Sequence, residues 1–454
     1  MSKRLIRFLS LFAVLTLILA ACGDGEGTAT TTGPDDTTGE TTGETTGETT
    51  GETTGETTGE TTGETTPAGE LGVIEVGAGE PIKIASLQAI SGANASLGED
   101  QNRAIEIAIT DWGQLEGHEI EFAYREDDLC SSEGGQTGAT RIVADPDVVG
   151  VIGTSCSGAG VPASEVITGA GRVLISGSNT SPVLTSDLVG NEGPEYHTGY
   201  YRTAHNDAIQ GAAAAKFVFE ELGLSNVATI HDGDPYTQGL TSAFGASFEE
   251  LGGTVVLATA VTPDQTDMRP VLTEVSAAGA ELIFYPIFQP AGDFIPEQAP
   301  EIGGLEETAL MGADGLLSDT YVVLPQTKGM YFSGPAAPDT PEYAELVTKY
   351  EEAFGEAPIQ SFHAHAYDAT NMLLAAIAEV AVVDGDNLTI DLQAVRDSLN
   401  GMTWEGLTGS LSCDEYGDCA APAIFIVQNT DETADIAAVR ANELIRYTAE
   451  ELGF

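Results

Sequence analysis

Two short stretches of small, hydroxyl-bearing residues could bind an anion. Residues 154–160 read Thr-Ser-Cys-Ser-Gly-Ala-Gly, and residues 176–182 read Ser-Gly-Ser-Asn-Thr-Ser-Pro. The first stretch leads into a helix-like segment, whose free N–H groups and positive dipole end suit a carboxylate. Ser157 could add its hydroxyl, and residues 176–182 offer a second set of donors. The alternative is that these serines only cap helices, which is the usual role of Ser and Thr at strand ends.

A carboxylate and an aromatic ring further along the chain could hold the other end of a ligand. Asp314 follows a strand-like run and could bind an ammonium group. In so acidic a chain, a solvated acid or a helix cap is the commoner role of a single Asp. Tyr236 closes the sequence Asp-Gly-Asp-Pro-Tyr and could lay its ring over a ligand.

The segments that must position these residues alternate between strand and helix patterns. Residues 82–87 form an apolar first strand, and the apolar residues from Ile105 to Trp112 recur at the spacing of one helical face. The alternation continues to residue 175 and restarts at residue 226. This pattern predicts two α/β lobes, each with a parallel sheet covered by helices on both faces.

Two lobes of this kind bind ligands between them, at the carboxyl ends of the parallel strands. The functional loops should therefore be the segments that directly follow strands. They are residues 91–98, 154–160, 176–182, 232–239, 286–292 and 313–319.

The order and spacing of several stretches resemble the branched-chain amino-acid (Leu/Ile/Val-type) substrate-binding proteins of ABC importers, a type I periplasmic-binding-protein family. The resemblance covers nearly all of residues 81–454. The stretches that carry it are 82–112 (IKIASLQAISGANASLGEDQNRAIEIAITDW), 151–164 (VIGTSCSGAGVPAS), 174–185 (LISGSNTSPVLT), 230–240 (IHDGDPYTQGL), 311–315 (MGADG) and 364–368 (AHAYD).

The resemblance implies two Rossmann-like lobes with parallel sheets, joined by a three-segment hinge and closing over the ligand. We expect residues 81–202 and 335–405 in lobe 1, and residues 203–334 and 406–454 in lobe 2. A protein of this family makes and breaks no bond, so no enzyme activity, cofactor or metal is expected.

The resemblance also implies roles for single residues. Ser157 and Thr180 would bind the ligand α-carboxylate, with help from the backbone near Ser178. Asp314 would hold the α-ammonium, and Tyr236 and Phe288 would line the cleft.

Two departures from the family pattern concern the ligand. Leucine-type binders usually have Glu where Asp314 stands, and an aromatic residue near the position of Leu97. Relatives in the family bind amides, urea or other small polar solutes, so these remain the alternative ligands.

Five cysteines divide into one at the N-terminus and four in the folded region. The four could pair in three ways. The resemblance implies a disulfide between Cys130 and Cys156. Cys413 and Cys419 bracket a hairpin-like turn and would pair locally. Free thiols or a metal site are the alternatives, but the C-x₂-C spacing of zinc sites is absent.

The first residues have the features of an export signal. Basic residues precede the apolar run 8–19, and Leu-Ala-Ala-Cys at 19–22 resembles a bacterial lipobox. We therefore predict a signal peptide at residues 1–21 and lipidation of Cys22; a plain secretory peptide is the alternative. Residues 22–80, which include seven copies of Thr-Thr-Gly-Glu, should form a disordered tether because they have almost nothing to bury.

The charge balance excludes some partners. With 71 acidic and 16 basic residues, the chain has a formal net charge of −55. No basic surface is available for nucleic acid or for anionic lipid. Such acidity fits either a salt-adapted organism or simple drift in composition.

The combined prediction is an extracytoplasmic, lipid-anchored solute-binding protein. It would capture a small amino acid, of branched-chain or aliphatic type, for the transmembrane permease subunits of an ABC importer by hinge closure. The membrane contact would be the lipid anchor alone. A ligand-sensing partner of a receptor is the alternative from another functional class.

Overall fold

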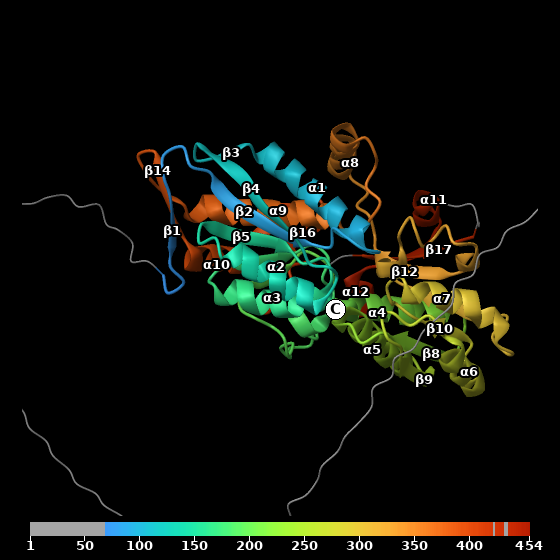
Figure 1. Cartoon of the computed structure of the whole chain (residues 1–454). Helices are drawn as coiled ribbons and strands as arrows, with labels where there is room; N and C mark the ends of the chain where they lie inside the picture. Colours follow the sequence, from blue (N-terminus) through green and yellow to red (C-terminus); the bar gives the residue numbers. More distant parts are fainter. Residues whose placement is uncertain (1–68, 421–422, 431–434) are drawn as a thin grey trace, which may run out of the picture. The chain divides into compact units, whose positions relative to one another are not determined.

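The computed structural model describes residues 69–420, 423–430 and 435–454. The predicted signal peptide, the lipidation site Cys22 and most of the tether lie outside the described residues. The end of the predicted tether is not disordered, because β1 (Val73–Val76) pairs with a strand of the folded region and buries Ile74 and Val76. The described chain forms two α/β lobes, each built around its own sheet (Figure 1).

Lobe 1 contains a six-stranded sheet in which every pairing except that of β3 with β4 is parallel. In sheet order the strands are β3 (Gln114–Leu115), β4 (His118–Asp127), β2 (Ile82–Gln88), β5 (Val148–Gly153), β6 (Val173–Ser176) and β7 (Tyr200–Arg202). Every residue of β5, Val-Val-Gly-Val-Ile-Gly, is buried. A run of this kind belongs to the centre of a parallel sheet covered on both faces, as predicted.

Helices cover both faces of the lobe 1 sheet and leave two separate apolar cores. One face is covered by α1 (Ala95–Trp112), α9 (His363–Val380) and α10 (Leu392–Gly401). The other is covered by α2 (Ser132–Val143) and α3 (Ser157–Gly169). Helix α8 (Pro341–Phe354) packs on α1, and a small antiparallel sheet of β1 (Val73–Val76), β14 (Asn387–Asp391) and β13 (Val382–Asp384) completes the lobe.

Lobe 2 contains a seven-stranded mixed sheet. In sheet order its strands are β18 (Glu443–Tyr447), β17 (Ile424–Gln428), β12 (Tyr331–Pro335), β11 (Ala309–Gly312), β10 (Leu282–Phe284), β8 (Asn226–His231) and β9 (Thr254–Ala260). Strands β8 to β12 are parallel, as predicted, but β17 and β18 add an antiparallel edge. The chain leaves this lobe at Pro335 and returns at Ile424 beside it, so β17 has to run back along β12.

The helices of lobe 2 also cover both faces of its sheet. One face carries α4 (Asp207–Lys216), α5 (Pro235–Glu250) and α12 (Ala449–Leu452). The other carries α6 (Arg269–Ala278), α7 (Ala291–Gln298) and α11 (Ile436–Ala441). Shorter helical pieces are the π-helical η2 (Phe217–Glu221) and the 3₁₀ turns η1 (Pro182–Leu184), η3 (Ala299–Glu301), η4 (Asp314–Leu316) and η5 (Pro325–Thr327).

The chain passes between the lobes three times: after β7, after β12 and before β17. Before the third crossing, the hairpin of β15 (Thr403–Gly406) and β16 (Gly409–Ser412) still belongs to lobe 1, because Leu411 and Cys419 are part of its core. Core packing therefore places this crossing after Cys419. The predicted boundary after residue 405 is therefore too early, because Leu411 and Cys419 still pack in lobe 1.

Two disulfides join Cys130 to Cys156 and Cys413 to Cys419. Both are the predicted pairs. The first ties the loop after β4 to the loop after β5, and the second closes the turn that follows β16.

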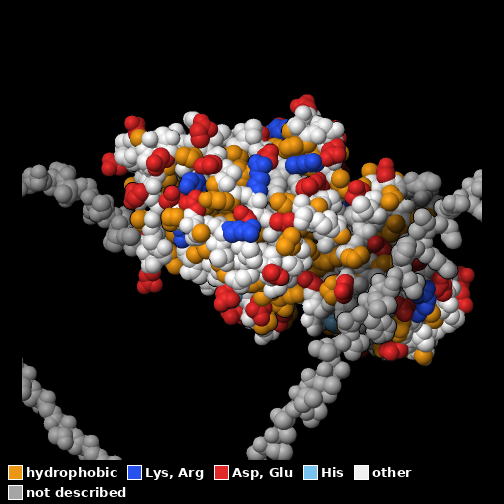
Figure 2. All heavy atoms as spheres, viewed as in Figure 1, with side chains coloured by type: hydrophobic (Ala, Val, Ile, Leu, Met, Phe, Trp, Pro, Cys, Tyr) orange, Lys and Arg blue, Asp and Glu red, His pale blue; other side chains and the backbone are white. Residues whose placement is uncertain are grey.

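Acidic side chains are scattered over the visible face of the molecule, and Lys and Arg are fewer (Figure 2). Within the described part of the chain, no helix is both long enough and apolar enough to span a bilayer.

Candidate ligand-binding site between the lobes

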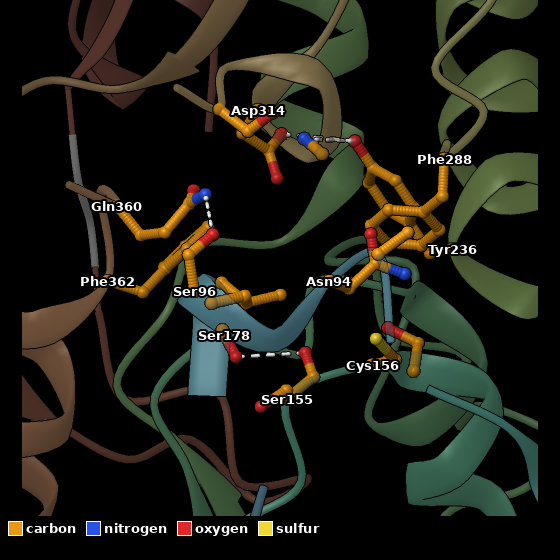
Figure 3. A pocket seen from close by; sticks show the side chains of 15 residues that line it. Asn94, Ser96, Ser155, Cys156, Ser178, Tyr236, Phe288, Asp314, Gln360 and Phe362 are labelled. Carbon is orange, nitrogen blue, oxygen red and sulfur yellow. Dashed lines mark hydrogen bonds between the residues drawn. The ribbon is translucent and has the colours of Figure 1, made fainter. Parts of the chain in front are cut away.

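A cavity lies where loops of both lobes meet. Figure 3 shows the 15 side chains that line it. Each of the loops predicted to be functional contributes at least one residue. The lining consists of Ala93, Asn94, Ser96, Leu97, Ser155, Cys156, Ser157, Ser178, Tyr236, Phe288, Asp314, Gly315, Ser318, Gln360 and Phe362.

The lobe 1 end of the cavity is built on the loop between β5 and α3. At the end of β5, Gly153 has φ of 144° and approaches Leu87 so closely that a Cβ would lie 2.1 Å from the Leu87 carbonyl oxygen. Only glycine fits there without displacing the backbone. The Ser155 N–H then donates to Oδ2 of buried Asp128 at 2.7 Å, which holds the loop in place.

Two serines at this end are fixed by other protein groups. The Ser178 hydroxyl donates to the Ser155 carbonyl at 2.9 Å and accepts from the Gln101 amide at 2.9 Å (Figure 3). The Ser155 hydroxyl donates to Gln88 Oε1 at 2.7 Å. These bonds make a rigid, neutral surface of hydroxyl groups, which is a suitable background for a ligand carboxylate.

Ser157 is the first residue of α3 and lines the cavity, as the sequence suggested. Its Oγ accepts a bond from the Ser181 N–H at 3.3 Å. No acceptor for its own hydroxyl proton lies among the described residues, so that proton can be donated into the cavity.

The start of α3 also receives a carboxylate from lobe 2. Asp234 caps α5 by accepting from the Tyr236 N–H at 2.8 Å, and its carboxylate also interacts with the Gly158 N–H. A Cβ at Gly158 would lie 2.1 Å from Asp234 Oδ2, so glycine is needed for this approach. Burial raises the pKa of Asp234 to about 7. Part of the helix start that the sequence assigned to a ligand is therefore faced by a protein carboxylate.

Thr180 is not brought to the cavity. It is almost fully buried and does not belong to the lining, whereas Ser178 two residues earlier does. The Thr180 hydroxyl interacts instead with Asp207, whose pKa burial and the nearby Asp314 raise well above its usual value.

The lobe 2 end of the cavity contains a buried carboxylate. Asp314 begins the 3₁₀ turn η4 directly after β11 and is 7% exposed. Its Oδ1 accepts from Gln210 Nε2 at 2.6 Å and from the Tyr236 hydroxyl at 3.3 Å. Burial raises the pKa of Asp314 to about 6, although both hydrogen bonds lower it. Both side-chain hydrogen bonds go to Oδ1, so no other side chain occupies Oδ2 and it could accept from a ligand.

Gln210 was not foreseen from the sequence, yet it orients Asp314. Its amide nitrogen also donates to Ser333 Oγ at 3.0 Å, and its amide oxygen is bonded to His205 Nε2. Burial lowers the pKa of His205 to about 4, so the ring is neutral near pH 7 and donates its Nε2 proton to the amide oxygen. The nitrogen of Gln210 therefore has to face Asp314.

Two aromatic rings form a side wall. The ring centroids of Tyr236 and Phe288 are 5.3 Å apart, and both side chains line the cavity (Figure 3). Phe288 also packs against an apolar cluster from lobe 1 that includes Leu97 and Phe362. These contacts surround a ligand with apolar groups between its two polar ends.

Sequence reasoning missed several lining residues. Four of them lie in segments that the strand pattern had marked as functional loops, so their approximate location could be predicted: Asn94, Ser96, Ser155 and Ser318. Gln360 and Phe362 precede α9 rather than follow a strand, and no periodic signal pointed to them.

The chain is similar to known binding proteins. Residues 81–433 match the family described as periplasmic binding protein. The chain is 30% identical to an amino acid binding protein of Pseudomonas aeruginosa, over 63% of this chain and 75% of that protein. It is 26% identical to Leu/Ile/Val-binding protein homolog 3 of Brucella melitensis, over 77% of this chain and 92% of that protein.

Solved structures share the fold. The leucine binding protein LivK of Thermotoga maritima matches with a TM-score of 0.69 and 20% identity, over 82% of this chain and 99% of that one. LivJ of Streptococcus pneumoniae, solved with isoleucine, has a TM-score of 0.66 and 21% identity, over 81% and 99%. A solute binding protein of Rhodopseudomonas palustris, solved with benzoate, has a TM-score of 0.64 and 17% identity, over 80% and 97%.

These matches confirm the resemblance seen in the sequence. The relatives and the solved structures reported above are binding proteins, not enzymes. The family match spans both lobes and the cavity-lining loops between them. This chain therefore belongs to the periplasmic binding protein family of extracytoplasmic solute-binding proteins, as a type I member alongside the Leu/Ile/Val-binding proteins.

Proposed function

We propose that the protein captures a small zwitterionic amino acid between its lobes and presents it to an ABC permease. The lobe 1 end of the cavity would bind the α-carboxylate through Ser157 and the neighbouring backbone. Asp314 would bind the α-ammonium, and Tyr236 and Phe288 would cover the ligand. The relatives are named for branched-chain amino acids, so these are tested together with their polar analogues.

The observation that carries this proposal is that no other side chain occupies Oδ2 of Asp314. A buried carboxylate without a cation is unfavourable, and a ligand ammonium 3 Å away would remove that penalty. Benzoate, which a structural neighbour binds, has no cation to offer and would place a second negative charge beside Asp314. The site therefore favours a zwitterion over an aromatic carboxylate.

Hinge closure supplies the mechanism. The carboxylate donors belong to lobe 1 and the ammonium acceptor to lobe 2, so only a closed molecule binds both ends of the ligand. A ligand with this differential affinity shifts the population towards the closed form. In this proposal the permease recognises that closed form.

Lipid anchoring and permease docking are further parts of the proposal. The lipobox-like sequence supports attachment through Cys22. Labelling of cells with a radioactive fatty acid should mark the wild-type protein and not Cys22→Ser. Site-specific cross-linking in membranes should capture the permease subunits; capture of a receptor alone would favour sensing over transport.

Isothermal titration calorimetry of the protein tests ligand capture. The panel contains leucine, isoleucine, valine, their polar analogues, acetamide, urea and benzoate. We expect at least one amino acid to bind, and Asp314→Ala to abolish that binding. Asp384→Ala, at an exposed acid away from the cavity, is the matched control. Binding of amino acids that neither Asp314→Ala nor Ser157→Ala weakens would refute the site.

A further inference from the structure

Part of the cavity wall has polar groups that neither end of the proposed ligand would use. Asn94 is the residue before α1, Ser96 lies in the first turn of that helix, and Gln360 comes from the segment before α9. Figure 3 shows all of them among the side chains around the cavity. We call these three side chains the polar recess.

Gln360 is held in one conformation. Its backbone N–H donates to Asp100 Oδ2 at 2.5 Å, and the N–H of Ile359 donates to the same oxygen at 2.6 Å. Its carbonyl bonds to His363 Nδ1 at 2.9 Å. Asp100 is itself anchored by the Tyr350 hydroxyl at 2.5 Å. Such fixation is expected of a residue that recognises a ligand.

The side-chain bonds of the recess leave specific groups unused. Gln360 Nε2 donates to Ser96 Oγ at 2.9 Å, but among the described residues Gln360 Oε1 has no partner. Ser96 keeps its hydroxyl proton for another acceptor. Gln360 as a whole is 6% exposed, and its side chain lines the cavity.

Asn94 is unusual for its position. It is the N-cap residue of α1, where Asn normally bonds to the first free N–H groups of the helix. Its side chain makes no capping bond. It lines the cavity instead, and its amide offers one acceptor and two donors.

An aliphatic ligand side chain would leave these groups unpaired on closure. Burying an unpaired amide or hydroxyl is unfavourable, whereas a matching ligand group removes the penalty. A charged side chain would find no counter-ion, because in the described lining Asp314 is the one charged residue and it faces the ammonium. A neutral side chain that both donates and accepts hydrogen bonds fits all three residues.

We propose that the polar recess selects amino acids whose side chains carry a neutral amide or hydroxyl group over aliphatic ones of the same shape. This inference rests on the proposed function, because the ligand must be anchored by its α-groups for its side chain to reach the recess. It names Asn94, Ser96 and Gln360 as specificity-determining residues.

Calorimetry with two shape-matched pairs tests the proposal. Threonine and valine differ by a hydroxyl for a methyl, and asparagine and leucine differ by an amide for an isopropyl group. We expect the polar member of at least one pair to bind about 10-fold or more tightly than its partner. Gln360→Leu and Asn94→Leu should each reduce that ratio towards one. Gln238→Leu, an exposed glutamine outside the cavity, should keep it.

The outcomes separate this inference from the proposed function. If valine and leucine bind as tightly as threonine and asparagine or more tightly, and Asp314 is needed for that binding, the proposed selectivity of the polar recess is wrong. Amino-acid capture would then still hold. No binding by any of the four amino acids would overturn both. If Gln360→Leu fails to fold, the half-buried Asn94 gives the deciding variant: an unchanged ratio in Asn94→Leu would reject the proposal.

Discussion

The two ends of the cavity are built on different principles. At the lobe 1 end, Ser155, Ser157 and Ser178 present neutral hydroxyls and backbone groups, and most are bonded to other protein atoms. At the lobe 2 end, Asp314 presents a full negative charge with one oxygen that no other side chain occupies. The lobe 1 end could therefore bind an anion through several neutral hydrogen-bond donors, whereas the lobe 2 end could bind a cation through one carboxylate.

Lobe 1 does contain a positive charge, but behind the site. Arg202 is completely buried; it forms an ion pair with Asp418 and donates to the Ser181 carbonyl at 2.9 Å. It therefore supports the loop 176–182 from beneath without lining the cavity. We therefore expect that loss of Arg202 lowers the stability of the fold, whereas loss of Asp314 weakens ligand binding.

Removal of Arg202 should give the largest effect. Arg202→Met leaves Asp418 buried without its partner, so the free energy of unfolding should fall by about 3–5 kcal/mol. Urea denaturation measures this change. Arg141→Met removes an exposed ion pair and should change it by less than about 1 kcal/mol. Equal effects of the two variants would show that lobe 1 does not depend on the buried cation.

Asp314→Asn should leave stability nearly unchanged and weaken amino-acid binding about 100-fold, or about 2.7 kcal/mol, because the ammonium loses its charged partner. Calorimetry measures the change, with Asp384→Asn as the exposed control. If Asp314→Asn weakened binding no more than Ser157→Ala, the proposed difference between the two ends of the cavity would be wrong.

Acid should weaken binding through the same carboxylate. The folded pKa of Asp314 is about 6, and the ligand ammonium binds the deprotonated form. Affinity should be constant above about pH 7 and fall about 10-fold by pH 5, as protonation competes with the ligand. Titrations at several pH values should show this fall in the wild type. A fall of the same size in Asp314→Asn would assign it to another group, such as Asp234.

Ser157→Ala should have a moderate effect. Loss of one hydroxyl donor should weaken amino-acid binding about 5-fold, close to 1 kcal/mol, because backbone donors at the start of α3 remain. Calorimetry measures it, and Ser242→Ala, an exposed serine of α5, serves as control. A loss as large as that of Asp314→Asn would mean that the carboxylate end also depends on one residue.

Thr180→Val should have the smallest effect on binding. Thr180 lies outside the lining, so affinity should change by less than about 2-fold, within the range of an indirect change. A 10-fold loss of affinity would indicate that Thr180 does bind the ligand carboxylate, as the family resemblance implied.

Much of the fold could be predicted from the sequence, because apolar periodicity is a local property. The strand and helix pattern restarts at residue 226, where β8 begins, and the marked loops all reach the cavity. The antiparallel edge of lobe 2 could not be predicted, because the direction of β17 depends on where the chain re-enters the lobe.

Less of the candidate site could be predicted from the sequence. Ser157 and Asp314 line the cavity, whereas Thr180 interacts with Asp207 and Ser155 takes a place in the lining; their roles in ligand binding stay predictions. Which hydroxyl of a loop faces a ligand depends on a few backbone angles and on buried partners such as Asp128, and neither leaves a pattern in the sequence.

By itself, the sequence determined the family resemblance, the two α/β lobes and the loops that meet between them, since each depends on residue order and spacing along the chain; the Cys130–Cys156 pair followed from the resemblance. Only the tertiary structure decided that Gln210 orients Asp314, that Asp234 approaches α3 and that Gln360 reaches the cavity. Those contacts join segments far apart in the chain, so they depend on how the chain folds and leave no pattern along the sequence.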